Sequence, residues 1–253
     1  MINLRRIQVL NIEAIKIIAA ITMLIDHIGA ILFPSVLPLR IIGRISMPLF
    51  AFAISEGCRY TKNRIRHFLQ MLLFAVACHT VYSIFTGDIH LNILVTFTLS
   101  IAVIYVLDFF KSSVLEMDKT TPEKLLATPI LIVVVAAVYL FCHAFSVDYG
   151  FFGVMTPVFA SIFDLRRVNV SDAVRRVDKV EIRVLSMAVG LAFYNLDIAL
   201  YGEYSFVHAF GFLAIPILLL YSGRKAKRSI KYFFYVFYPT HLLILELIAF
   251  LLF

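Results

Sequence analysis

The sequence predicts an all-α protein, a polytopic transmembrane helical bundle of about nine spans with a cytoplasmic N-terminus. Hydrophobic residues make up 62% of the 253 residues and charged residues only 15%, and the mean hydropathy is +0.94. Soluble domains carry roughly 25% charged residues. Apolar runs and short loops account for nearly the whole chain, so we expect one domain over residues 1–253 with no separate soluble module.

The apolar runs divide the chain into candidate spans. A helix that crosses a bilayer needs about 20 residues at a rise of 1.5 Å each. The candidates lie at 12–33, 39–58, 67–86, 91–110, 126–147, 149–163, 184–201, 205–221 and 231–252. The sixth is the shortest, and its crossing needs separate support.

The charges between the spans predict their orientation. The segments after spans two, four, six and eight are rich in Lys and Arg, whereas those after spans three, five and seven contain Asp88, Asp148 and Glu203 and no Lys or Arg. Arg5 and Arg6 precede the first span. The positive-inside rule therefore places the N-terminus and the four basic loops in the cytoplasm. Because the loops on either side of spans five and six are both basic, the short sixth segment is predicted to cross.

The net charge of +7 does not indicate a nucleic-acid partner, because the basic residues sit in short loops between apolar runs. We expect membrane lipids around the chain and no nucleic acid. The three cysteines form no CxxC pair, and the seven histidines lack the carboxylate-rich spacing of a zinc site, so no metal site is predicted.

Ionisable residues inside the first two spans are the main candidates for function, because charge within a bilayer is costly. Asp26 and His27 lie in the first span, with His27 about 9 Å inside the outer boundary. Arg44 lies at a similar depth in the second span, and the short connection predicts antiparallel neighbours. We expect Asp26 to pair with Arg44, which leaves His27 free; a polar pair that only fixes helix packing is the alternative. Arg40 shares the face of Arg44 and could instead be an interfacial anchor.

Three further polar positions are candidates. Glu56 lies three and four residues before Arg59 and Tyr60, so these side chains can meet, either in a site or as an interfacial pair at a helix end. His241 lies near mid-membrane in the last span and shares a face with Tyr238. Asn92 lies near the start of the fourth span, where an interhelical hydrogen bond is the alternative explanation.

These residues suggest acyl transfer. A neutral imidazole at His27 could take the proton from a hydroxyl or amine as that group attacks a thioester, and a nearby arginine could stabilise the developing negative oxygen. Lys16 lies three turns before His27 on nearly the same face, about 16 Å away. Coenzyme A would fit this path, with its phosphates held at the cytoplasmic side by Lys16, Arg59 and Arg64.

Five stretches together resemble the TraX family: IKIIAAITMLIDHIGAILFP (15–34), LRIIGRISMPLFAFAISEGCRYTKNR (39–64), LNILVTF (91–97), DYGFFGV (148–154) and KYFFYVFYPTHLLIL (231–245). The namesake of that family is the conjugative-pilin N-acetylase, and its relatives are polytopic membrane acyltransferases that use cytoplasmic acyl-CoA. The resemblance implies roles for the residues that match its motifs: His27 and Asp26 in DHIG, Arg40 and Arg44 in RxxGR, Glu56 in EG, and His241 with Tyr238 in YPxHL.

We therefore expect an integral membrane acyltransferase of the bacterial inner (plasma) membrane, which transfers acetyl from acetyl-CoA to a hydroxyl or amine with His27 as general base. The acceptor could be a peptide, a glycan or a lipid-linked group, and the attack could be direct or pass through an acyl-histidine. A transporter or flippase that uses the buried Asp, His and Arg as a relay is the main alternative, although no repeated halves are visible. A noncatalytic scaffold would not need Asp26 and His27 in apolar surroundings.

Overall fold

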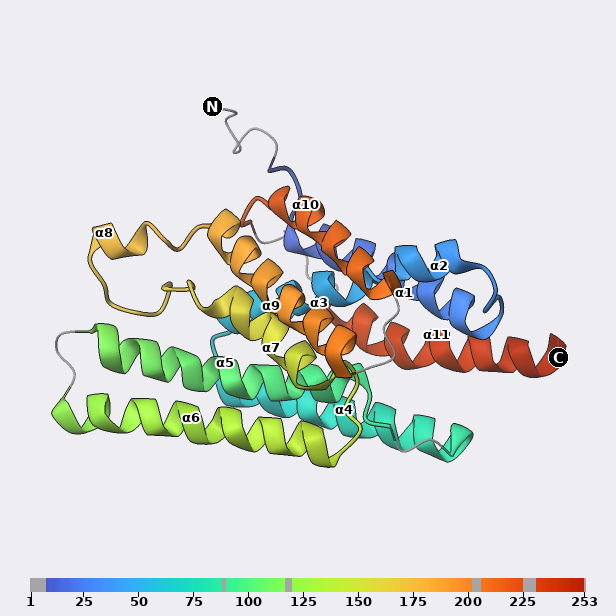
Figure 1. The fold of residues 1–253 in the computed structure, drawn as a ribbon, viewed down its shortest axis with the longest axis horizontal. Helices are drawn as coiled ribbons and strands as arrows, with labels where there is room; N and C mark the ends of the chain where they lie inside the picture. Colours follow the sequence, from blue (N-terminus) through green and yellow to red (C-terminus); the bar gives the residue numbers. More distant parts are fainter. Residues whose placement is uncertain (1–7, 88–89, 117–119, 202–205, 225–230, 253) are drawn as a thin grey trace. The chain divides into compact units, whose positions relative to one another are not determined.

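The computed structural model describes residues 8–87, 90–116, 120–201, 206–224 and 231–252, and over these residues the chain is helical with two isolated β-bridges and no strand (Figure 1). The helices are α1 (Ile12–Ile31), α2 (Leu37–Gly43), α3 (Ser46–Tyr60), α4 (Arg64–Thr86), α5 (Ile93–Leu115), α6 (Thr121–Ala144), α7 (Gly150–Ser161), α8 (Asp172–Arg175), α9 (Val180–Tyr201), the 3₁₀ helix η2 (Phe206–Leu213), α10 (Ala214–Leu219) and α11 (Lys231–Leu252). The predicted all-α fold class is confirmed.

Each of the nine predicted spans coincides with one helix or with an adjoining pair. Among the described residues, six helical segments are long and apolar enough to cross a membrane: Ile12–Ile31, Leu37–Tyr60, Arg64–Ile84, Ile93–Leu115, Thr121–Ala144 and Val180–Tyr201. Three shorter apolar helices lie at Gly150–Ser161, Phe206–Leu219 and Val236–Leu252. The chain is thus a multi-pass membrane protein. Nine crossings and a cytoplasmic N-terminus stay predictions, because several charges that support them, such as those of Arg5 and Glu203, lie outside the described residues.

The chain divides into two compact units, one formed by residues 1–53 and 195–253 and the other by residues 54–194. In the first unit, α1 packs against α2 and α11. In the second, α5 contacts α4, α6 and α7 (Figure 1), and its buried side chains Ile101, Val103 and Ile104 belong to the unit's apolar core. The prediction that residues 1–253 act as a single domain stays a prediction.

A proline interrupts the second predicted span. Pro48 has no N–H, and its ring would clash with the carbonyl group of Arg44 in a continuous helix. The chain accordingly turns at Arg44 and Ile45, between α2 and α3. This break leaves Arg44 at the end of α2, where its side chain can turn toward α1.

Two glycines bring α1 and α2 close together. A Cβ atom at Gly29 would lie 2.7 Å from Leu39 Cβ, and a Cβ atom at Gly43 would lie 2.1 Å from Asp26 Oδ1 and 2.2 Å from Asp26 Cβ. Neither position has room for a larger residue without a shift of the neighbouring helix. The close approach places Asp26 directly against the α2 backbone.

The short helix α7 ends with its last carbonyl groups bonded to side chains of α5 and α9. Lys111 Nζ donates to the carbonyl oxygens of Ser161 at 2.9 Å and Asp164 at 2.7 Å. Arg183 Nε donates to Ala160 O at 3.3 Å, and Ser186 Oγ donates to Phe159 O at 2.7 Å. Carbonyl groups at a helix end need such partners where water is absent. A 12-residue apolar helix can therefore end inside the second unit.

Candidate functional site

Asp26 binds two arginines within the first unit. Its Oδ2 atom accepts from Arg44 Nη2 at 2.5 Å and lies 3.0 Å from Arg40 Nη1, which also donates to the Asp26 backbone oxygen at 3.0 Å. The expected pairing of Asp26 with Arg44 is thus present, and Arg40 joins it. One carboxylate and two guanidinium groups leave this cluster with a formal charge of +1, which suits the stabilisation of a developing anion.

The two arginines differ in exposure. The Arg44 side chain is 11% exposed and the Arg40 side chain 30%. Arg44 is therefore the internal partner of Asp26, whereas Arg40 can present N–H groups to a molecule outside the cluster. The difference in exposure gives the two arginines of the RxxGR motif different roles.

His27 and His241 form a hydrogen-bonded pair. His27 Nδ1 lies 2.8 Å from His241 Nε2, and the ring centroids are 4.9 Å apart. The histidines come from α1 and α11, 214 residues apart in sequence. His27, which the sequence left without a partner, is therefore held in place by a second predicted site residue.

The backbone of α11 fixes the tautomers of this pair. His241 Nδ1 lies 2.7 Å from Phe237 O, and a carbonyl oxygen can only accept, so Nδ1 carries the hydrogen. In a neutral ring, His241 Nε2 must then accept from His27 Nδ1–H. The lone pair of neutral His27 is consequently on Nε2, the nitrogen that takes no part in the pair.

The surroundings of the two histidines differ. His241 is 5% exposed, whereas His27 is half-buried. The ring of Phe237 stacks on His241 at 4.7 Å between centroids, and Tyr238 packs edge-on at 6.0 Å. His241 is thus the less exposed ring of the pair, and His27 is the more exposed one.

Lys16, the predicted contact for the donor phosphates in the first unit, already has partners. Its Nζ lies 3.1 Å from Glu13 Oε1 and 5.9 Å from the ring centroid of Phe234 on α11. The side chain is 23% exposed. A contact between Lys16 and an anionic ligand would compete with Glu13.

Glu56 pairs with Arg183, a residue that sequence spacing could not identify. The two charged groups form an ion pair in the second unit, and both side chains are 2% exposed. The sequence allowed contacts with Arg59 and Tyr60, which lie on the same helix. The structure instead buries Glu56 against α9, where this ion pair links α3 to α9; the predicted contact with substrate stays a prediction.

Arg59 and Arg64, the other predicted donor contacts, are also bound by carboxylates. Arg59 pairs with Asp164 and with Asp178, the latter at 2.7 Å. Arg64 Nη2 lies 2.7 Å from Asp108 Oδ2. These ion pairs neutralise the charges of Arg59 and Arg64 within the second unit. The predicted contacts of the two arginines with coenzyme A phosphates stay a prediction, and a phosphate would have to compete with the carboxylates.

Asn92 begins α5. Its Oδ1 atom accepts from the backbone N–H groups of Leu94 at 3.0 Å and Val95 at 3.4 Å, so the side chain caps the helix. Thr96, on the same face, donates to Asp148 O at 2.6 Å. The Thr96 contact joins α5 to the segment before α7, and the cap gives Asn92 a structural role. The predicted contact of Asn92 with substrate stays a prediction.

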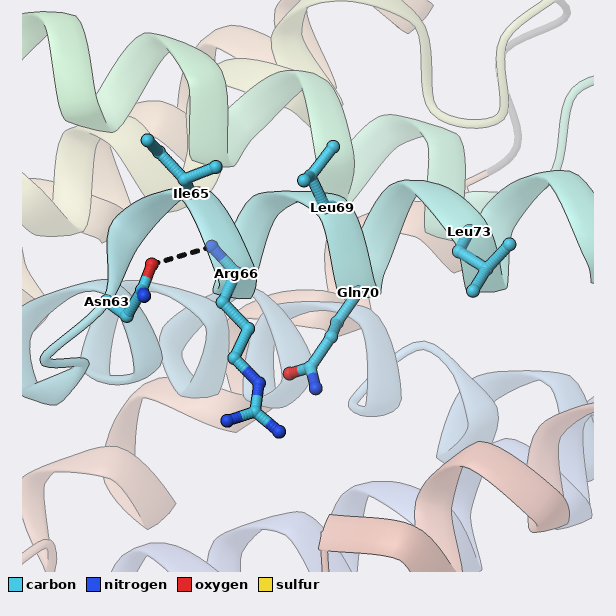
Figure 2. Close-up of a pocket in the computed structure, with 6 residues that line it drawn as sticks. All are labelled: Asn63, Ile65, Arg66, Leu69, Gln70 and Leu73. Atoms are coloured by element: carbon cyan, nitrogen blue, oxygen red, sulfur yellow. Dashed lines mark hydrogen bonds between the residues drawn. The ribbon is translucent and has the colours of Figure 1, made fainter.

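A depression of about 430 Å³ lies along α4, and no predicted catalytic residue is among those that line it. Figure 2 shows Arg66 and Gln70 extending in the same direction from this helix, while Asn63 accepts from the Arg66 backbone N–H at 2.8 Å. Arg66 and Gln70 are the polar lining groups beyond this cap, and the other lining residues are Ile65, Leu69 and Leu73. The depression contains no base or nucleophile.

Sequence reasoning missed several charged residues of the second unit. Asp108 and Lys111 form an ion pair at 2.9 Å inside the apolar helix α5, and both are buried. Their position three residues apart within an apolar run was the available signal. Asp164 and Asp178 carried no such signal, because both lie in the segment that follows the sixth apolar run, which is rich in basic residues.

The sequence model of one protein family, described as TraX protein, matches residues 11–249. A relative from Dichelobacter nodosus, described as probable fimbrial assembly protein FimC of serogroup H1, is 27% identical over 252 residues, which is 91% of this chain and 92% of that protein. An uncharacterized protein of Rickettsia prowazekii is 32% identical over 102 residues, which is 40% of this chain and only 38% of the relative. No solved structure matches.

Proposed function

Because the chain belongs to the TraX family, we propose that it is a membrane-bound acyltransferase that moves acetyl from acetyl-CoA to a hydroxyl or amine, with His27 as general base. The bacterial inner membrane is the proposed location, because it gives a multi-pass protein access to cytoplasmic acetyl-CoA. A base needs an available lone pair and a fixed orientation. The observation that carries the proposal is the hydrogen-bonded series from Phe237 O through His241 to His27, which leaves Nε2 of His27 as acceptor.

In the proposed step, His27 takes up one proton and later releases it. The acceptor's O–H or N–H gives its proton to His27 Nε2 while the oxygen or nitrogen attacks the thioester carbonyl carbon. The C–S bond then breaks, and the leaving thiolate takes the proton from the His27 imidazolium. His241 Nε2 accepts from His27 Nδ1–H throughout, so it stabilises the positive ring that forms in between.

The arginine cluster supports the anionic oxygen of the tetrahedral intermediate. Asp26 directly precedes His27 in α1, and its two arginines leave the cluster with one surplus positive charge. Arg40 is the more exposed arginine and is the proposed donor to that oxygen. Arg44 holds Asp26 in place and is proposed to act through it.

Binding of the donor phosphates is assigned to exposed cations rather than to the paired ones. Arg59 and Arg64 are bound to carboxylates, and Lys16 is bound to Glu13. In the first unit, which contains the proposed base, Arg224 is an exposed basic side chain. A search for the donor's phosphate contacts should begin with this residue.

The test is release of coenzyme A thiol by the purified protein supplied with acetyl-CoA and a crude membrane extract of lipids and peptides. We expect His27→Ala to lower the rate by about 10²- to 10⁴-fold, the usual contribution of a general base. His90→Ala is the matched control, since His90 is 46% exposed and lies in the other unit. Full activity in His27→Ala would remove the assigned base. A wild-type protein that neither binds acetyl-CoA nor releases thiol would refute acyl transfer and favour a transporter.

A further inference from the structure

A groove of about 410 Å³ runs along α11 beside the histidine pair. It lies wholly within the first unit, where α11 packs against α1. Its lining comprises Leu24 of α1 and seven residues of α11: Phe233, Val236, Phe237, Thr240, His241, Ile244 and Leu245.

Most of the side chains that line the groove are apolar. Its polar groups belong to Thr240 and His241, and both ring nitrogens of His241 are already engaged, one with Phe237 O and one with His27. A sugar or phosphate placed there would lose water without gaining partners. A hydrocarbon chain has no hydrogen bonds to lose there and can pack against the apolar side chains.

The rim of the groove is open. Val236 is 64% exposed, Phe233 53% and Ile244 51%. These residues lie on an apolar helix of a multi-pass membrane protein, and the medium beside such a helix is hydrocarbon. A molecule that is dissolved in the bilayer could enter the groove from the side without passing through water.

The groove also adjoins the proposed base. His241 both lines it and binds His27, and Leu24 lies one helical turn before His27 on α1. A hydrocarbon tail lying along α11 would therefore bring its head group to the histidine pair. The donor does not account for such a groove, because acetyl has a single methyl group and the arm of coenzyme A is polar.

We propose that this groove, defined by Leu24 and the seven lining residues of α11, holds the hydrocarbon tail of a lipid-carried acceptor whose hydroxyl or amine is acylated at His27. The inference rests on the proposed function and specifies its acceptor. A peptide acceptor, which the name of the fimbrial relative favours, is the competing outcome.

The experiment supplies radiolabelled acetyl-CoA to membrane vesicles that contain the full chain, then separates organic-soluble lipid from precipitated protein and from the aqueous phase. We expect the label to enter the lipid fraction. Val236→Trp and Ile244→Trp, which fill the groove at two points, should each lower this labelling tenfold or more. Leu243→Trp is the matched control on the same helix, because Leu243 is exposed but does not line the groove. Gel filtration checks that each variant is folded.

The outcomes separate the two proposals. Absence of thiol release by the wild type would refute the acyltransferase itself. Thiol release with label only in protein or in the aqueous phase would leave the enzyme intact and overturn the lipid-carried acceptor, as would groove variants that label lipid at the wild-type rate. A second donor, palmitoyl-CoA, completes the test: a wild-type preference for it that both tryptophan variants abolish would assign the groove to the donor's chain and overturn the inference.

Discussion

Replacing His241 by leucine removes the acceptor that holds His27 Nδ1–H at 2.8 Å. Leucine keeps the apolar character of the groove beside it, and no carboxylate or arginine of the Asp26 cluster is changed. His27 remains in α1, but its ring is free to rotate and to place its hydrogen on either nitrogen. The variant therefore tests orientation and charge stabilisation rather than the presence of a base.

The magnitude follows from the hydrogen bond that is lost. In the transition state His27 becomes an imidazolium, so the bond to His241 Nε2 has a charged donor. A neutral hydrogen bond contributes about 0.5–1.5 kcal/mol and one to a charged group about 1.5–3 kcal/mol, so the bond strengthens by about 1–1.5 kcal/mol as the ring becomes charged. Because only this gain lowers the barrier and each ~1.4 kcal/mol is a factor of ten in rate, His241→Leu should lower kcat by roughly 5- to 12-fold. This is a smaller loss than that expected for His27→Ala, because the base itself is retained.

The assay is steady-state thiol release, with two companion variants. His241→Gln keeps a side-chain acceptor at the same position and should recover part of the rate. The double variant His27→Ala/His241→Leu should be no slower than His27→Ala alone, because His241 acts only through His27. Multiplicative losses in the double variant, or equal rates for leucine and glutamine at position 241, would refute the proposed pairing.

Two predictions concern packing. Gly43→Ala forces a Cβ atom to within 2.1 Å of Asp26 Oδ1, so we expect a loss of about 1–3 kcal/mol in stability and a fall in thiol release; Gly57→Ala, whose Cβ atom would meet only ordinary contacts at 3.5 Å, is the control. Glu56→Gln leaves Arg183 buried without its anionic partner and should cost about 3–5 kcal/mol, measured as thermal unfolding in detergent. Replacing both Glu56 and Arg183 by methionine should restore much of that stability, and a double variant no better than Glu56→Gln would contradict a structural role for the pair.

The sequence predicted the helical segments well because the signal for them is local. Length and apolarity alone locate each of the nine segments, and every one coincides with helical structure. The break at Pro48 within the second segment was not predicted, although the proline itself was visible. Apolar runs report how much chain can lie in a membrane and do not report where a helix turns inside it.

The contact between Asp26 and Arg44 could also be predicted. The two residues are 18 apart and lie on neighbouring helices joined by a short connection, so helical rise and antiparallel packing place them at one depth. Sequence reasoning could not identify Gly43 as the residue that leaves room for Asp26, because the need for glycine there depends on the distance between the α1 and α2 backbones.

The sequence by itself determined a multi-pass helical protein, its family resemblance, and the first-unit residues that carry ionisable groups. Only the tertiary structure decided their partners: His27 with His241 across 214 residues, and Glu56 with Arg183 across 127. Spacing along one helix identifies neighbours three or four residues apart, whereas these pairs arise from how distant helices pack. For the same reason Arg59 looked available to a ligand in the sequence, since the carboxylates that neutralise it come from residues more than one hundred positions away.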